Sequence, residues 1–555
     1  MPPLLLIGRP MSHSFASRSS ARAGLLALTL AVLSGAGWAG APGLPGPSGA
    51  VANDHQISIM QDDDRLLYRS DATRVMTLET MKKLGVQAVR VTVLWNAVAG
   101  QARTTPARRR TFRADQPDTY PRGSWDRFDD LDEEATHLGI SVYFDVTGPG
   151  PPWTRQQPVT HDKHAAKPWK PKPSDFYSFM VAVGRRYSGT AKDRAGRPIP
   201  RVGMWSIWNE PNQGGWLTPQ WERVGGQLIP ESPILYRSLY LYGRKALDAS
   251  GHGSDFIMAG ETAPIGVSRQ TSTSAMAPAK FIRELFCVAD NGQPYTGAAA
   301  AVRGCSIFGR LGPVRASAWA HHPYTKKVNP TTRDSEPGSI TIANIADLSK
   351  LLDGLASTTG HLASGLPIMS SEFGYETNPP DPYFGMPLEQ QAAWMNIGDF
   401  LAWEDPRVVG QAQLQLVDAG PVPHTPVHSR KHWATYQAGL YFLKGKPKPS
   451  LTAYALPFYA FPEGNNDANG HKVYGVWGQL RFDDGKISAQ APDQVQIEFR
   501  PSGSGAWVAL GPTGTVTDPQ GFFAGAIPIP GAGSLRARFF RPDVGQRISR
   551  EVQVG

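Results

Sequence analysis

The chain has 555 residues, of which 41% are hydrophobic and 10% aromatic, and this content of large apolar side chains excludes a disordered protein. The length exceeds that of one ordinary domain, so we expect two folded units, one of them large enough to be a barrel. The net charge of +9 is mild for this length, and the arginine run 108–110 lies in a stretch rich in Thr, Pro and Gln. We therefore interpret that run as a solvated loop and expect no nucleic-acid partner.

The amino terminus has the pattern of an export signal. Arg18 and Arg22 precede an apolar run over residues 23–33, and Ala39-Gly40-Ala41 fits a cleavage site for signal peptidase. The run is shorter than the roughly 20 residues that a membrane-spanning helix needs. We therefore predict a signal peptide over residues 1–41 and a secreted, monomeric protein without a membrane anchor after processing.

From residue 51 to residue 460, short apolar runs alternate with amphipathic stretches of helical period. The predicted strands cover residues 57–61, 88–93, 140–145, 202–208, 256–259, 318–321, 367–370 and 411–416. The predicted helices include residues 71–84, 125–138, 176–187, 342–355 and 388–403. Strands that alternate with helices predict parallel pairing, and this number of units fits an α/β (β/α)8 TIM barrel over 51–460 better than an open doubly wound sheet. A Gly-x-Gly-x-x-Gly run after a strand, which would indicate dinucleotide binding, is absent from the sequence.

The composition changes near residue 461. From there to residue 555 short runs alternate with period two between turns rich in Gly, Pro and Asp. This pattern predicts a β-sandwich accessory domain. Such a domain either binds glycans or covers a face of the barrel, and we favour the structural role because we find no evident aromatic platform.

The two cysteines of the chain, Cys287 and Cys305, enclose one short loop. In an exported protein such a pair predicts a structural disulfide, and two free buried thiols are the alternative. Two cysteines do not supply the four ligands of a structural zinc site. We expect neither a metal nor a cofactor.

Two carboxylates follow predicted strands of the barrel. Glu210 ends the fourth strand and Glu372 ends the seventh. Ligands of a (β/α)8 barrel bind at the carboxyl ends of its strands, so the two side chains are expected to share one cleft. Two carboxylates that face one cleft are what glycoside hydrolysis requires.

With the triplet Asn209-Glu210-Pro211 closing a Trp-rich strand, the sequence resembles glycoside hydrolase clan A, the retaining (β/α)8 enzymes that include families 5 and 39. The resemblance implies that Glu210 is the general acid/base and Glu372 the nucleophile. It also implies that Asn209 hydrogen-bonds the 2-hydroxyl of the sugar.

The same resemblance extends to three further positions. His322-Pro323-Tyr324 is similar to the His-x-Tyr of the clan, which implies that Tyr324 hydrogen-bonds the nucleophile. Arg90 on the second strand resembles the arginine of the clan that keeps the nucleophile ionised. A guanidinium at this place is expected to lower the pKa of Glu372. We group Arg90, His322 and Tyr324 with the substrate-binding residues.

Other residues at strand ends complete the expected binding site. Glu261 ends the fifth strand, and we interpret it as a substrate-binding group or as one that supports the site from behind. Trp153 and Trp216 lie on loops rich in Gly and Pro, where flat rings can stack on sugars. The third strand ends at Asp145, where family 5 commonly has a histidine, which leaves the family and the sugar open.

We therefore expect a secreted retaining glycoside hydrolase that cleaves O-glycosidic bonds of an oligo- or polysaccharide by double displacement with two Glu residues. The alternative is a non-catalytic glycan-binding or surface protein on a TIM-barrel scaffold. A third possibility is a barrel hydrolase that uses a metal, and the sequence shows no cluster of metal ligands.

Overall fold

The computed structural model describes residues 55–158, 163–481, 493–542 and 545–555, so the predicted signal peptide over 1–41 lies outside the described residues. Within the described part, eight parallel strands close a barrel in the order β1-β10-β9-β8-β7-β4-β3-β2. The (β/α)8 barrel predicted from the sequence is confirmed. The barrel strands are β1 Ile57–Gln61, β2 Ala88–Leu94, β3 Ser141–Thr147, β4 Met204–Ile207, β7 Phe256–Thr262, β8 Ala318–His321, β9 Ile368–Phe373 and β10 Val408–Leu414.

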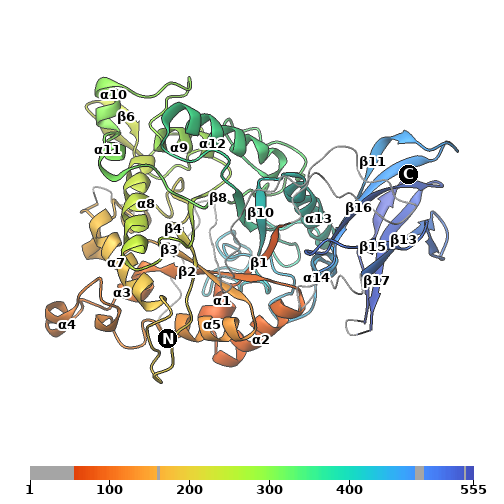
Figure 1. Cartoon of the computed structure of the whole chain (residues 1–555), viewed down its shortest axis with the longest axis horizontal. Helices are drawn as coiled ribbons and strands as arrows, with labels where there is room; N and C mark the ends of the chain where they lie inside the picture. Colours follow the sequence, from red (N-terminus) through yellow and green to blue (C-terminus); the bar gives the residue numbers. More distant parts are fainter. Residues whose placement is uncertain (1–54, 159–162, 482–492, 543–544) are drawn as a thin grey trace.

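Helices surround the barrel (Figure 1). Each helix predicted from the sequence is present. The longer helices are α2 Asp71–Lys83, α5 Asp126–His137, α7 Pro173–Arg186, α8 Ser232–Ala249, α9 Pro278–Leu285, α12 Ala346–Thr359 and α13 Leu388–Glu404. The shorter elements are α1 Asp63–Leu67, α3 Trp95–Ala99, α4 Pro106–Thr111, α6 Lys163–Ala166, α10 Gly297–Val302, α11 Ile307–Leu311, α14 Pro449–Ala455, the 3-10 turns η1 Pro117–Thr119, η2 Pro152–Thr154 and η3 Ile342–Asn344, and the hairpin β5 Trp221–Val224 with β6 Gln227–Pro230.

The period of a β-strand decides which side chains reach the centre of the barrel. In β2, Val89, Val91 and Val93 face outward and join the main hydrophobic core. The alternate residues point inward, where Ala88 belongs to a cluster with alanine, methionine and tyrosine side chains of other strands. This alternation places Arg90 inside the barrel with no exposed surface.

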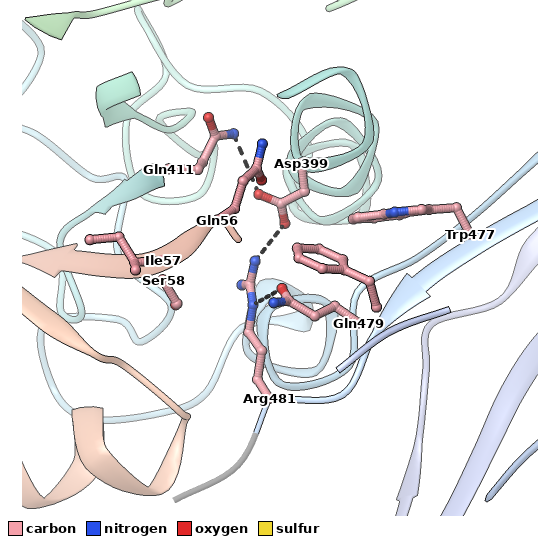
Figure 2. A pocket seen from close by; sticks show the side chains of 9 residues that line it. Gln56, Ile57, Ser58, Asp399, Gln411, Trp477, Gln479 and Arg481 are labelled. Atoms are coloured by element: carbon pink, nitrogen blue, oxygen red, sulfur yellow. Dashed lines mark hydrogen bonds and ion pairs between the residues drawn. The ribbon is translucent and has the colours of Figure 1, made fainter. Parts of the chain in front are cut away.

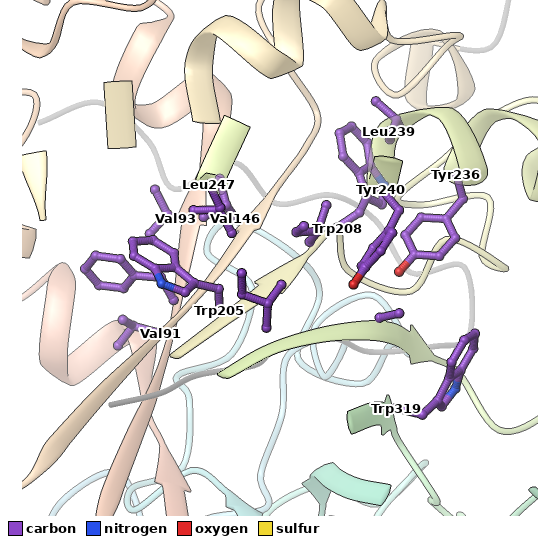
Figure 3. Close-up of a cluster of buried hydrophobic side chains, with 14 of the residues drawn as sticks. Val91, Val93, Val146, Trp205, Trp208, Tyr236, Leu239, Tyr240, Leu247 and Trp319 are labelled. Atoms are coloured by element: carbon purple, nitrogen blue, oxygen red, sulfur yellow. The ribbon is translucent and has the colours of Figure 1, made fainter. Parts of the chain in front are cut away.

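Large aromatic side chains fill the layer between the strands and the helices (Figure 3). Trp205 and Trp319 have no exposed surface, and Tyr236 and Tyr240 of α8 belong to the same buried cluster. Aromatic residues bury more apolar area than any other type, so this layer fixes the strands whose ends carry the polar groups.

The carboxyl-terminal region forms two antiparallel sheets, which confirms the predicted sandwich; its first strand begins at Phe458, just before the predicted start at residue 461. One sheet has the order β11-β12-β16 and the other β14-β13-β17-β18, with β15 on β13 and β19 on β17. The strands are β11 Phe458–Asn466, β12 Lys472–Gln479, β13 Asp493–Pro501, β14 Val508–Ala509, β15 Gly514–Val516, β16 Phe522–Ile529, β17 Gly533–Arg541, β18 Gly545–Ile548 and β19 Val552–Val554.

The sandwich packs on the barrel through aromatic side chains. Phe400 of α13 contacts Trp477 of β12, and Phe522 of β16 joins the same cluster. Beside this cluster, the guanidinium of Arg481 lies 3.4 Å from the carboxylate of Asp399 (Figure 2). The aromatic face of the first sheet is therefore used against the barrel, in agreement with a structural role for the domain.

Cys287 and Cys305 form a disulfide, as predicted from their spacing. Where the sequence predicted a solvated loop, the arginine run lies on the short helix α4. Thr105 caps this helix by accepting a hydrogen bond from the Arg108 amide at 3.2 Å, and Pro106 suits its first turn. The arginine side chains are exposed, as expected. Among the described residues, no helix combines the length and apolar character needed to cross a membrane.

Candidate active site

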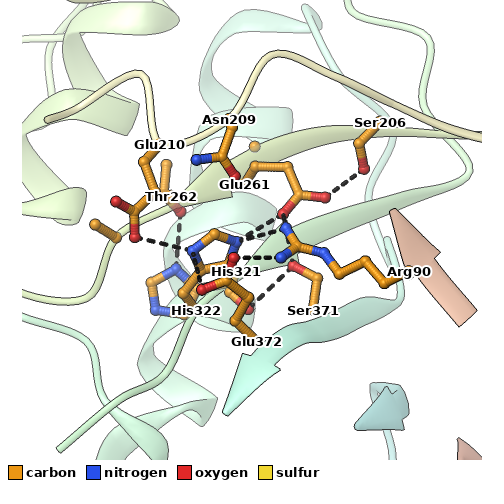
Figure 4. Close-up of polar contacts among 12 residues, drawn as sticks. Arg90, Ser206, Asn209, Glu210, Glu261, Thr262, His321, His322, Ser371 and Glu372 are labelled. Carbon is orange, nitrogen blue, oxygen red and sulfur yellow. Dashed lines mark hydrogen bonds and ion pairs between the residues drawn. The ribbon is translucent and has the colours of Figure 1, made fainter. Parts of the chain in front are cut away.

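The carboxyl ends of the barrel strands bring a set of charged side chains together in the interior (Figure 4). Arg90 comes from β2, Glu261 from β7 and Glu372 from β9, while Glu210 and His322 lie just beyond β4 and β8. All of them have no exposed surface. Residues that are far apart in the sequence thus meet because parallel strands of a closed barrel end on the same face.

Local irregularities of the backbone turn these side chains toward one another. Glu210 and Glu261 have left-handed backbone conformations, with φ of 35° and 48°. The pairing of β7 with β8 shifts register between Gly260 and Thr262, and the pairing of β9 with β10 shifts where Glu372 lies. Such bulges re-aim side chains, and left-handed non-glycine residues cluster at functional sites.

One guanidinium connects two of the carboxylates. Arg90 Nη1 donates to Glu372 Oε1, and Arg90 Nη2 donates to Glu261 Oε2 at 2.7 Å. The hydroxyl of Tyr324 donates to the other oxygen of Glu372 at 2.8 Å. Both oxygens of Glu372 are therefore held, as the sequence predicted for Arg90 and Tyr324.

Glu261 is the most heavily hydrogen-bonded carboxylate of the site. Besides Arg90, it accepts hydrogen bonds from Tyr143 at 2.6 Å and from Ser371 at 2.8 Å, and one from Ser206. Burial alone would raise the pKa of Glu261, but the Arg90 charge and the hydrogen bonds outweigh it and lower the pKa to about 2. Glu261 is thus ionised at any ordinary pH.

Arg90 lowers the pKa of Glu372, as expected, but the net shift of that pKa is upward. Burial raises the pKa of Glu372 well above its usual range, and the repulsion of Glu261 and Asp145 adds to this effect. Arg90 and Tyr324 lower that pKa without offsetting the burial. The physical reason is that the loss of solvation outweighs the Arg90 charge, which Glu372 shares with the ionised Glu261.

His322 bridges two carboxylates. Its Nε2 lies 2.7 Å from Glu261 and its Nδ1 lies 2.9 Å from Glu210. The ionised Glu261 can only accept, so Nε2 carries a hydrogen, although Arg90 Nη2 lies 3.1 Å from the same nitrogen. The short contact at Nδ1 then requires one further proton, carried by either His322 or Glu210.

The two candidate catalytic carboxylates are close together. An oxygen of Glu210, an oxygen of Glu372 and a ring nitrogen of His322 all lie within 4.8 Å of one another. Such a group could hold a cation by spacing alone. However, Glu372 is already bonded to the Arg90 guanidinium, which would repel a metal ion, so these contacts favour proton chemistry over metal binding.

A cleft with a volume of about 420 Å³ opens at this end of the barrel. Among the predicted site residues, Glu210 and Tyr324 line it. Gln213, whose amide could bond a sugar hydroxyl, also lines it. The lining residues that were not predicted include Lys326, Lys327, Tyr375, Tyr383, Phe384, Arg430 and Tyr436. Tyr375, Tyr383 and Phe384 lie on the segment between β9 and α13, so extending the search along that whole segment would have found them.

Several residues predicted to bind substrate have other positions. Arg90, His322, Glu261, Asn209 and Glu372 are not among the residues that line the cleft. Arg90 contacts Glu372 and His322 contacts Glu210, while Glu261 contacts Arg90 and His322. Trp153 lines a separate hollow with Arg103, and Trp216 does not line the cleft. The stacking predicted for the two tryptophans therefore has no support in this structure, because neither ring lines the cleft that Glu210 lines.

Two buried polar side chains of the site have no hydrogen-bond partner within the described residues. Both amide atoms of Asn209 lack one, and so do both carboxyl oxygens of Asp145. Burial and the repulsion of Glu261 raise the pKa of Asp145 well above its usual range. An unpaired buried amide is costly without a ligand, so Asn209 is suited to a bound hydroxyl group.

We expect Arg90→Met to lower the free energy of unfolding by about 3–5 kcal/mol near pH 7, because the buried, ionised Glu261 loses its counter-charge and Glu372 loses a hydrogen-bond donor. The depressed pKa of Glu261 adds stability that is complete above its unfolded pKa and is lost as the pH falls toward 2. The substitution removes this contribution, so the deficit should be smaller near pH 4, about the unfolded pKa, than near pH 7.

Urea unfolding of both proteins at the two pH values measures this difference. The control is Arg185→Met, which removes an ion pair whose two side chains are each 42% exposed and should cost about 1 kcal/mol or less. Equal losses in the two variants, or a deficit that does not change with pH, would contradict the assignment.

Comparison with models of known families finds no match, and a search of curated proteins also finds none. Solved structures do resemble the chain. A glucosidase from Croceicoccus marinus has 10% identity and a TM-score of 0.45, with 87% of this chain and 95% of that chain covered. A monomeric beta-xylosidase from Caulobacter crescentus has 14% identity and a TM-score of 0.45, with 88% and 95% covered.

A glycoside hydrolase family 5 structure from Bacteroides vulgatus has 10% identity and a TM-score of 0.39, with 90% of this chain and 89% of that chain covered. Similarity at this level of identity concerns the backbone fold and not the chemistry. The chemistry of this protein has to be argued from the side chains of its own site.

Proposed function

We propose that the protein is a retaining glycoside hydrolase in which Glu372 is the nucleophile and Glu210 the general acid/base. The observation that carries the proposal is the approach of two buried carboxylates, Glu210 and Glu372, to within 4.8 Å of each other, with Glu210 lining the cleft. Retaining enzymes place their carboxyl groups about 5–5.5 Å apart, whereas inverting enzymes need about 6.5–9.5 Å to admit a water. With one oxygen of each carboxylate within 4.8 Å of the other, there is little room for a water between them, which supports double displacement.

The surroundings of each carboxylate support its role. Glu372 is held through both oxygens by Arg90 and Tyr324, which fixes it for attack on an anomeric carbon. Glu210 lines the cleft and shares a proton with His322, so it can protonate a departing oxygen.

The reaction then has two steps. In the first, a carboxylate oxygen of Glu372 bonds to the anomeric carbon while the glycosidic C–O bond breaks, and the leaving oxygen takes the proton of Glu210. In the second, Glu210 accepts a proton from a water that attacks the same carbon, and the bond to Glu372 breaks. Asn209 has the free amide that a sugar hydroxyl requires during both steps.

The alternative is a glycan-binding protein without catalysis. A protein that only binds glycans has no need of a carboxylate, that of Glu372, whose two oxygens both accept hydrogen bonds. It also has no need of a proton shared by Glu210 and His322 beside the cleft. Binding of glycans without release of reducing sugar would favour that alternative.

We expect Glu372→Gly to abolish hydrolysis and Glu210→Ala to lower kcat by about 10²–10⁴-fold. Azide should partly restore both variants on activated aryl glycosides. The glycosyl azide should have inverted anomeric configuration from Glu372→Gly and retained configuration from Glu210→Ala, because only the latter still forms the covalent intermediate. NMR of the products measures this.

Glu389→Ala is the matched control, because Glu389 is exposed on α13. Normal turnover by Glu372→Gly would show that another group attacks the sugar. The opposite assignment of the two azide products would exchange the roles of Glu210 and Glu372.

We expect Glu261→Gln to move the pH–rate profile to lower pH by about one unit or more. Without the Glu261 charge, the proton shared by His322 and Glu210 is held less tightly, so the basic limb falls. Glu372 loses a repelling neighbour and keeps Arg90, so its pKa and the acidic limb fall as well.

Measurement of kcat/KM against pH tests this expectation. Glu284→Gln is the control, because Glu284 is equally buried in an ion pair with Arg303 at 2.8 Å but does not belong to the site. An unchanged profile in Glu261→Gln would contradict the proposed coupling between Glu261, His322 and Glu210.

We also propose that the protein is secreted. The signal-like pattern of residues 1–41 and the disulfide between Cys287 and Cys305 support export to an oxidising compartment. The amino terminus of protein recovered from the culture medium should lie just after Ala41. Recovery of only full-length protein from the cell interior would contradict this.

A further inference from the structure

Three cationic side chains line the same cleft as Glu210. Lys326 and Lys327 lie on the loop after β8, two and three residues beyond Tyr324, and Arg430 lies on the loop between β10 and α14. The cleft wall beside them is aromatic, with Tyr383 and Phe384 from the loop after β9, and Arg430 lies over the Phe384 ring with its guanidinium 5.7 Å from the centroid. Loops from three barrel strands therefore converge on one cationic and aromatic surface.

None of the three cations forms an ion pair within the described residues. The ammonium of Lys327 donates to the carbonyl oxygen of Tyr383 at 3.2 Å, a contact that leaves its charge uncompensated. The charges in the cleft are thus available to a ligand.

The environment of Lys326 agrees with an anionic ligand. Burial lowers the pKa of Lys326, and the charges of Asp334 and Glu210 raise it without offsetting the burial. Lys326 keeps exposed surface, so its ammonium can reach an anion in the cleft, and such an anion would stabilise the charged form. Glu376 also lines the cleft, but when Glu210 carries its proton the three cations outnumber this one carboxylate.

We propose that the sugar bound beside Glu210 carries an acidic substituent, a carboxylate or a sulfate ester, that Lys326, Lys327 and Arg430 recognise. The proposal rests on the proposed glycosidase function and names its substrate class. Arginine presents a planar fork that matches the paired oxygens of either group, while lysine supplies a mobile point charge. The aromatic wall of Tyr383 and Phe384 can hold the apolar face of the same ring.

The test compares matched aryl glycosides that share a ring configuration and differ at one substituent: neutral sugars, the corresponding uronic acids and the 6-O-sulfated sugars. Neutral and acidic polysaccharides complete the panel. We expect kcat/KM to be at least about ten-fold higher on the acidic member than on its neutral counterpart. Added NaCl should lower this rate on the acidic member alone, because salt screens the attraction. The carboxylated and sulfated arms identify which substituent is bound.

Substitution then assigns the effect to the residues. Arg430→Met and Lys326→Met should each lower kcat/KM on the acidic substrate by about ten-fold or more and leave the neutral one within about three-fold. Lys444→Met is the matched control, because Lys444 is exposed and does not line the cleft. It should change neither rate.

A preference for the neutral member, or equal effects of Arg430→Met on both members, would overturn the inference. Hydrolysis of a neutral glycoside that depends on Glu372 would in that case leave the proposed function intact. If the folded wild-type protein hydrolyses no member of the panel, the proposed function fails and the inference fails with it.

Discussion

The contact of Arg90 with two carboxylates is the interaction on which the site depends. Three buried carboxyl groups, those of Asp145, Glu261 and Glu372, act on the buried guanidinium of Arg90, and a fourth, that of Glu210, is joined to them through His322. One positive charge cannot keep all of them ionised in a medium of low dielectric. Several hydrogen-bond donors keep Glu261 ionised. Asp145, Glu210 and Glu372 therefore include groups that carry a proton. The site is thus prepared to hold and move protons before any substrate arrives.

The architecture could be predicted from the sequence because it depends on local periodicity. The alternation in β2 separates outward valines from the inward Arg90, and the same rule applied to each run gives a barrel of parallel strands. The rule that polar groups at strand ends converge then brings Glu210 and Glu372 together. The disulfide followed from the count and spacing of the cysteines.

Other features could not be predicted, because they depend on non-local geometry. The bulges at Glu261 and near Glu372 arise from pairing with neighbouring strands, and nothing in either segment alone specifies the extra residue. Burial of Glu372 outweighs the Arg90 charge, so the pKa of Glu372 shifts in the direction opposite to the one expected. Likewise, Tyr383 lines the cleft whereas Trp153 lines a separate hollow, and this placement depends on how the loops fold.

In the proposed mechanism, a carboxylate oxygen of Glu372 forms a covalent bond to the anomeric carbon of the sugar. Trapping that bond is the most direct test. A 2-deoxy-2-fluoro glycoside with a good leaving group, made with the sugar that the substrate panel identifies, should form an intermediate that hydrolyses slowly. Mass spectrometry should then find one added glycosyl unit per chain, on the peptide that contains Glu372. A label on Glu210 or Glu376, or inactivation without any covalent adduct, would contradict the mechanism.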